Sequence, residues 1–171
     1  MAQESYNVGL LRAAKNGNTE IVDSMLAQGA SVDATDEAGS TPLMLAAGLG
    51  HQKSVRSLIS AWADIDRADG SGWTALLRSA RRGHVAVMRE LLSAGADINA
   101  HDRLGWNGLL RACRSGSLEA VQLLLDAGID LNARNKEGNT ALIMSVGWGY
   151  QEVVELLLTA SPDVNAQNQA N

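Results

Sequence analysis

Apolar residues recur at helical spacing along the chain, in short segments that polar turns separate. Val121, Leu124 and Leu125 lie three and four residues apart, and the segment 154–158 repeats this spacing. Side chains at such spacing share one face of an α-helix. A shorter apolar segment precedes each of these helices. The pattern therefore predicts a series of helix pairs, each with an apolar face that needs a neighbour.

The helix pairs repeat with a period of 33 residues and without insertions. Full units begin at Asp36, Asp69, Asp102 and Asn135, and an incomplete first unit joins the same register at Val8. Glycine and leucine keep this register, as in Gly17, Gly50, Gly83, Gly116 and Gly149, and in Leu10, Leu43, Leu76, Leu109 and Leu142. A fixed period of this length is the signature of a repeat solenoid, and we expect Leu76, Leu109 and Leu142 to be buried between its layers.

Capping residues mark where the helices of each unit begin and end. The first helix follows a good N-cap in every full unit, namely Thr41, Thr74, Asn107 and Thr140. Pro42 stands at the first helical position, where proline is well tolerated. The second helix stops at Gly29, Gly95 or Gly128, and glycine accepts the left-handed conformation that commonly ends a helix. A tight turn follows, as in ADINA and IDLNA.

The segments GSTPLMLAAGLGH and ELLSAGADINAHD resemble the ankyrin repeat, with its T-P-L-H-x-A signature. The resemblance implies an all-α, ankyrin-type α-solenoid of stacked helix-turn-helix repeats with projecting β-turn or hairpin loops. It covers nearly the whole chain and implies one domain, 1–171, with an N-terminal capping repeat at 5–35, repeats at 36–68, 69–101, 102–134 and 135–167, and a tail at 168–171. It also implies a non-enzymatic module for protein–protein interaction.

The chain departs from the ankyrin signature at several positions. The signature histidine is absent from all four full units, and packing must replace its contacts. Its place is taken by Met44, Leu77, Leu110 and Ile143. Trp62 replaces the glycine that ends a second helix, and Ser161-Pro162 replaces it in the last unit. Because a left-handed Trp is strained, we expect these two turns to be remodelled.

Composition and charge narrow the functional class. The net charge of −5 and the pI of about 5.1 argue against nucleic acid and anionic membrane as the main target. A single cysteine, Cys113, excludes an intramolecular disulfide and favours a reducing compartment. The N-terminus is unlike a secretory signal, and the sequence has no apolar stretch of about 18 residues. We expect a cytoplasmic protein with no membrane contact.

The residues that could carry out catalysis follow the repeat, which favours structural roles for them. His51 and His84 share one repeat position, and Cys113 aligns with alanines. The carboxylates of Asp36 and Asp69 stand one period apart, as turn formers do. Neither a zinc-ligand spacing nor a phosphate-binding loop motif is present. The sequence predicts no enzyme activity, no cofactor and no metal site.

Charge is segregated along each unit. The first-helix segments 8–16, 41–49, 74–82, 107–115 and 140–148 carry seven Arg and Lys residues and no Asp or Glu. Trp and Arg are the residues most enriched at binding hot spots. We predict a partner-binding patch on the concave face, in which the tryptophans project and the arginines stay outside the core. Its residues are Trp73, Arg78, Arg81, Arg82, Trp106, Arg111, Arg114 and Trp148. The alternative interpretation is that Arg is simply a good helix former on a solvated face.

The predicted partner is another protein, through a segment with acidic and apolar or aromatic character. Two alternatives stay open: an Arg groove for nucleic acid or another anionic ligand, and a regulatory fragment of a larger protein. The last second helix, 151–160, is as apolar as an internal one, although a terminal repeat needs a polar outer face. We therefore expect exposed apolar residues at Val153, Leu156 or Leu157, and self-association through this repeat or a continuing array.

Overall fold

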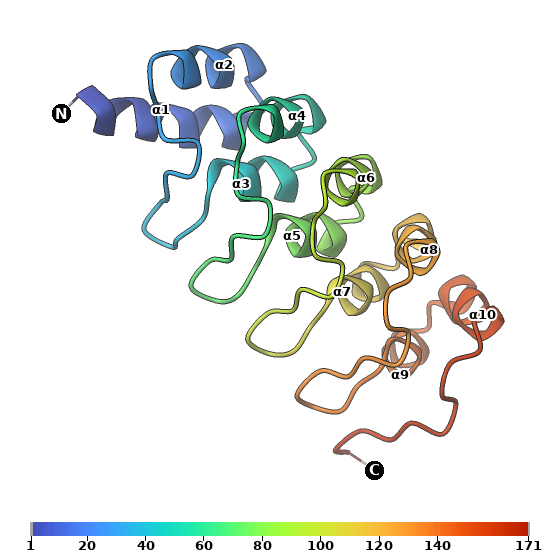
Figure 1. The fold of residues 1–171 in the computed structure, drawn as a ribbon. Helices are drawn as coiled ribbons and strands as arrows, with labels where there is room; N and C mark the ends of the chain where they lie inside the picture. The colour runs from blue at the N-terminus through green and yellow to red at the C-terminus, as the bar shows by residue number, and fades with distance from the viewer. Residues whose placement is uncertain (1, 171) are drawn as a thin grey trace.

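The computed structural model describes residues 2–170, which form a curved stack of helix pairs (Figure 1). The loops that connect successive pairs project from the stack on one side. Within this range the helices are α1 (Ala2–Asn16), α2 (Thr19–Ala27), α3 (Pro42–Gly48), α4 (Gln52–Ser60), α5 (Ala75–Arg81), α6 (Val85–Ser93), α7 (Gly108–Ser115), α8 (Leu118–Asp126), α9 (Ala141–Trp148) and α10 (Gln151–Thr159). The prediction of an all-α solenoid is confirmed. Helix α1 begins ahead of Val8, where the repeat pattern starts.

The helices form two rows, and each repeat contacts mainly its neighbours. The inner row consists of α1, α3, α5, α7 and α9, and each of these packs against the next. The outer row consists of α2, α4, α6, α8 and α10. Each outer helix packs against the next outer helix and against the inner helix of its own repeat. Each repeat therefore buries its apolar face only by stacking on another repeat.

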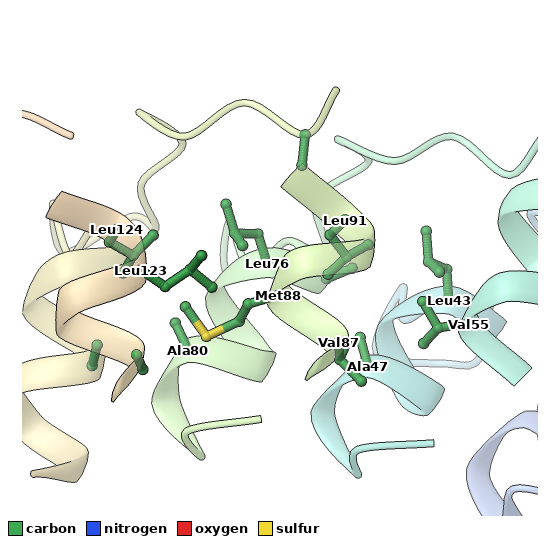
Figure 2. Close-up of a cluster of buried hydrophobic side chains, with 14 of the residues drawn as sticks. Leu43, Ala47, Val55, Leu76, Ala80, Val87, Met88, Leu91, Leu123 and Leu124 are labelled. Atoms are coloured by element: carbon green, nitrogen blue, oxygen red, sulfur yellow. The ribbon is translucent and has the colours of Figure 1, made fainter. Parts of the chain in front are cut away.

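The core lies between the rows and continues from repeat to repeat (Figure 2). Leu43, Leu76 and Leu109 are fully buried, as the register predicts. Leu142 is only half-buried, contrary to expectation, because no described inner helix follows α9. Cys113 is fully buried, and burial raises the pKa of its thiol to about 11. The thiol is therefore protonated near neutral pH and acts as a small packing residue.

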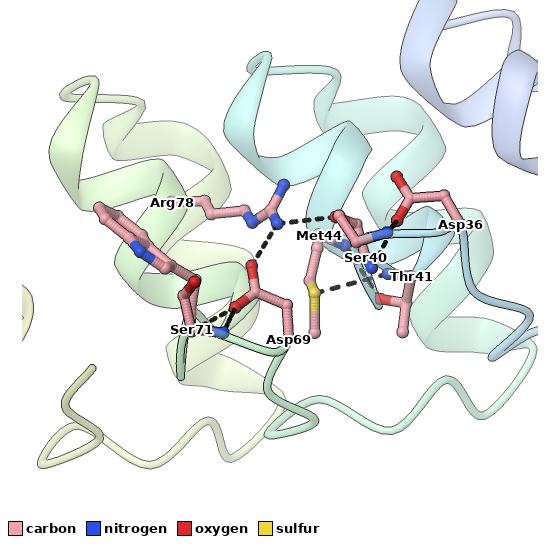
Figure 3. Close-up of polar contacts among 9 residues, drawn as sticks. Asp36, Ser40, Thr41, Met44, Asp69, Ser71 and Arg78 are labelled. Carbon is pink, nitrogen blue, oxygen red and sulfur yellow. Dashed lines mark hydrogen bonds and ion pairs between the residues drawn. The ribbon is translucent and has the colours of Figure 1, made fainter. Parts of the chain in front are cut away.

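The predicted N-caps hold the first helix of each full repeat. Thr41 accepts a hydrogen bond from the Met44 amide at 3.2 Å, and Asn107 accepts one from the Leu110 amide at 3.0 Å. The apolar residues at the signature histidine position are buried at Met44, Leu77 and Leu110. The Thr41 amide also donates to the Met44 sulfur, at 3.4 Å (Figure 3). Packing thus takes the place of the histidine, as expected.

The turns after α4 and α10 keep the left-handed conformation, so the expectation that they are remodelled is wrong. Trp62 has φ 64° and Ser161 has φ 58°, in the same left-handed region as Gly29, Gly95 and Gly128, whose φ angles are 90°, 92° and 82°. The amides of Trp62 and Ala63 donate to the carbonyl oxygens of Ile59 and Leu58, at 3.0 and 3.1 Å. Ala63 is buried in the core. Buried packing and satisfied cap bonds therefore impose the turn on whichever residue occupies it.

The apolar face of the last helix also differs from expectation. Val153 and Leu157 are buried in the core and Leu156 is half-buried, because this stripe of α10 faces α8 and α9. The prediction that the last repeat exposes apolar residues is met, but by residues other than those predicted. The exposed large apolar residues of the last repeat are Val146, Trp148, Tyr150, Leu158 and Val164.

Replacing Trp62 by glycine should stabilise the protein. The Trp62 side chain is 90% exposed, so its removal loses few contacts. A non-glycine residue in the left-handed region costs about 1–2 kcal/mol, which Trp62→Gly should recover in urea unfolding. Gly95→Trp, at the same repeat position with open space around it, should lose a similar amount. Unchanged or lower stability of Trp62→Gly would show that the indole contributes to the fold.

Candidate partner-binding groove

An Asp or Asn at the start of each projecting turn sets the shape of that turn. One carboxylate oxygen of Asp69 accepts the amides of Ser71 and Trp73, at 2.7 and 3.0 Å. Asp102 accepts the amides of Leu104 and Trp106 in the same way. These contacts confirm the predicted role of the acidic residues as turn formers. They also fix the backbone of the tryptophan that precedes each N-cap.

The second carboxylate oxygen of these residues binds an arginine of the following inner helix. Arg78 pairs with Asp69 at 2.6 Å and donates to the Ser40 hydroxyl at 2.8 Å (Figure 3). Arg111 pairs with Asp102 in the next repeat. Sequence reasoning missed both ion pairs. The signal was present as an Asp nine residues before an Arg in two successive units.

The tryptophans and arginines form one stack along the inner face, by which we mean the surface formed by the inner row of helices and the projecting turns. The Arg111 guanidinium lies 4.0 Å from the ring centroid of Trp73 and 4.4 Å from that of Trp106, so it is held between two repeats. Arg81 lies 5.4 Å from Trp73, and Arg114 lies 5.4 Å from Trp106. All four distances are within the range of cation–π attraction.

The stack continues into the last repeat. The ring of Trp148 stacks on that of Trp106, with centroids 6.5 Å apart and an interplanar angle of 25°. The ring centroid of Tyr150 lies 6.3 Å from that of Trp148, with the two rings tilted relative to each other. We call the set Trp73, Arg111, Trp106 and Trp148, with the flanking Arg81 and Arg114, the Trp–Arg stack. It joins side chains from three successive repeats.

Burial and hydrogen bonding set the charge states inside the site. Burial alone would raise the pKa of Asp69, but hydrogen bonds from the Trp73 amide, the Arg78 guanidinium and the Ser71 amide together lower it. Burial lowers the pKa of Arg111, and Arg114 and Arg81 add repulsion, whereas Asp102 raises it. An arginine stays protonated under such a shift. Asp69 and Arg111 are therefore both charged near neutral pH.

The eight predicted site residues divide by exposure. Arg81, Arg82, Arg114 and Trp148 are exposed, and Trp73 and Arg78 are half-buried. Trp106 is 8% exposed and Arg111 is 4% exposed. The expectation that Trp106 projects and that Arg111 stays outside the core is wrong. The period places each of them between two neighbouring repeats, where stacked rings and an ion pair cover them.

A groove with a volume of about 410 Å³ lies beside the stack, where α1, α3 and α5 meet the turn before Thr74. Trp73, Arg78, Arg81 and Arg82 line it, as do residues that sequence reasoning did not assign to the site: Lys15, Met44, Leu45, Gly48, Leu49, Asp69 and Ser71. Asp69 is the one carboxylate of this lining, and Arg78 neutralises it. The groove can therefore take an anionic and apolar ligand.

The other candidate residues have structural contacts. The His51 Nε2 atom lies 3.1 Å from the Lys15 carbonyl oxygen, and the His51 ring packs over Gly17 of the preceding repeat. His84 packs over Gly50 in the same manner. Within residues 2–170, no three His, Cys, Asp or Glu side chains are close enough to hold a metal ion. No helix in the described part of the chain is long and apolar enough to cross a membrane.

Arg111 should contribute to stability much more than Arg114. Arg111→Ala would leave the buried Asp102 carboxylate without its cation, and breaking a buried pair costs about 3–5 kcal/mol. Arg114→Ala removes an exposed side chain and should change stability by about 0.5 kcal/mol or less. Urea unfolding of the two variants measures the difference. Equal stabilities would contradict a structural role for Arg111.

Comparison with known proteins agrees with this architecture. A family model described as ankyrin repeats in three copies matches residues 10–102 and again residues 94–168. No curated protein matches the sequence. The two matches cover almost the whole described chain and agree with the period, the caps and the stacked helix pairs. The chain belongs to the ankyrin repeat family.

Proposed function

We propose that this chain is a non-enzymatic module that binds another protein on its inner face, through a segment with acidic and apolar character. Ankyrin repeats are generally modules of protein–protein interaction. The observation that carries the proposal is the charge of the inner face. Arg81, Arg82 and Arg114 are exposed there, and none of them is in an ion pair among residues 2–170.

The Trp–Arg stack prepares this face for binding. The carboxylates of Asp69 and Asp102 pair with Arg78 and Arg111, so these two cations stabilise the fold. The exposed guanidiniums of Arg81 and Arg114 lie near the indole rings and keep free N–H donors. A partner carboxylate can bind them while a neighbouring apolar side chain contacts an indole. Rings held by stacking lose little side-chain entropy when the partner binds.

Nucleic acid or another anionic ligand is the alternative use of the same cations. Single-stranded nucleic acid binds by stacking its bases on open aromatic rings. Here Arg111 already covers Trp73 and Trp106, and Trp148 stacks on Trp106. The net charge of −5 also repels polyanions. The observations therefore favour a protein partner, and the same groove would serve if the chain regulates a larger protein of which it is part.

Two further properties belong to the proposal. The exposed apolar residues of the last repeat, among them Val146 and Leu158, provide a surface for self-association or for a further repeat. The lone Cys113 is buried, which suits a cytoplasmic, reducing compartment.

The double variant Arg81→Glu/Arg114→Glu should lose partner binding without unfolding. With a partner isolated by affinity capture, loss of about 2 kcal/mol or more, roughly thirtyfold in Kd, is expected for hot-spot residues. Arg89→Glu is the matched control, because Arg89 is exposed on the outer helix α6. Calorimetry measures both affinities, and thermal unfolding checks the folds.

Two outcomes would contradict the proposal. The first is equal loss of affinity in the Arg89→Glu control, which would place the partner on the outer face. The second is salt-sensitive binding of random single-stranded DNA that is tighter than the binding of the captured protein. That result would favour the nucleic-acid alternative.

A further inference from the structure

The groove described above has an unusual arrangement along one repeat position. Lys15, Gly48 and Arg81 stand one period apart, at the last turns of α1, α3 and α5. Stacked repeats place them side by side, with the glycine in the middle. Gly48 has no side chain to fill the space between the two cations, and all three residues line the groove.

The groove combines apolar side chains with cations on its two flanks, and the Arg78 side chain, which is paired with Asp69, lies beside Gly48. Leu45 of α3, the C-cap residue Leu49 and Trp73 line it, and Leu49 is exposed to solvent. Lys15 lies on one flank, and Arg81 and Arg82 lie on the other. Lys15, Arg81 and Arg82 are in no ion pair within the described chain. A volume of about 410 Å³ is large enough for one leucine-sized or aromatic side chain and the backbone beside it.

The spacing of the repeats sets the length of segment that can use both flanks. Packed helices lie about 8–10 Å apart, so α1 and α5 are separated by about 16–20 Å across α3. An extended chain advances about 3.3–3.6 Å per residue, so about five residues cover this span. A carboxylate near each end of such a segment would reach a cation while an apolar side chain between them enters the groove.

We propose that the groove between Lys15 and Arg81 is the subsite for an extended peptide segment of the partner, in which one large apolar residue stands between two acidic residues about five positions apart. This inference rests on the proposed function and narrows it to one place and one ligand pattern. The apolar residue packs on Leu45, Leu49 and Trp73. The carboxylates bind Lys15 on one side and Arg81 with Arg82 on the other.

Selection from a displayed library of random linear peptides tests the pattern. Peptides selected on the intact chain should be enriched in acidic residues that flank a large apolar residue at this spacing. Individual peptides are then synthesised and measured by fluorescence anisotropy. Selected peptides without acidic enrichment, or without the central apolar residue, would overturn the inference.

Gly48→Gln fills the groove without changing its charge. Gln is a better helix former than Gly, and a Cβ at position 48 meets Arg78 Cβ at 3.4 Å, so the helix should tolerate it. Loss of the apolar side chain from its site should weaken peptide binding about tenfold to hundredfold. Gly147→Gln is the matched control, since Gly147 occupies the same repeat position in α9 and a Cβ added there meets no atom of another element within 4 Å.

The outcomes separate this inference from the proposed function. Weak binding by Gly48→Gln with full binding by Gly147→Gln supports the subsite. Full binding by Gly48→Gln together with lost binding by Arg114→Glu would overturn the subsite and leave the inner face as the binding surface. Full binding by Gly48→Gln, Arg114→Glu and Arg81→Glu would overturn both.

Discussion

The structure depends on one constraint, which is that no repeat can bury its apolar face by itself. Two short helices present more apolar surface than they can cover, so each pair must stack on the next. Leu43, Leu76 and Leu109 meet this need at one position in three successive repeats, and all are fully buried. Leu142 at the same repeat position is only half-buried, because no described inner helix follows α9 to cover it. Side chains that share a repeat position therefore become spatial neighbours.

This constraint also builds the candidate site. Arg111 lies between Trp106 of its own repeat and Trp73 of the repeat before it, at 4.4 and 4.0 Å from the ring centroids. Because a guanidinium is planar, one cation can contact an indole on each side and still pair with Asp102. The same stacking sets Lys15, Gly48 and Arg81 in a row, where the missing side chain opens the groove. The scaffold residues and the residues that line the groove thus arise from one period.

Much of the fold could be predicted from the sequence, because period, caps and apolar spacing are local signals that agree with one another. The site was only partly predictable. Charge segregation located the inner face, but the sequence did not show that Arg111 and Trp106 are buried, since burial depends on the contacts between repeats. At Trp62 the prediction relied on a local preference that contacts in the folded chain override. Local backbone preference predicted a remodelled turn, whereas the buried Ala63 and two cap hydrogen bonds hold the left-handed one. The fold does not explain why Trp62 stands there.

The central claim is that the inner face receives the partner while the outer helices support it. Hydrogen exchange of the chain with and without a saturating captured partner tests this claim directly. The account predicts added protection in segments 41–49 and 74–82 and in the turn before Thr74, with little change in α4, α6 and α8. Added protection confined to the outer helices, or to α10 and the segment after it, would contradict it.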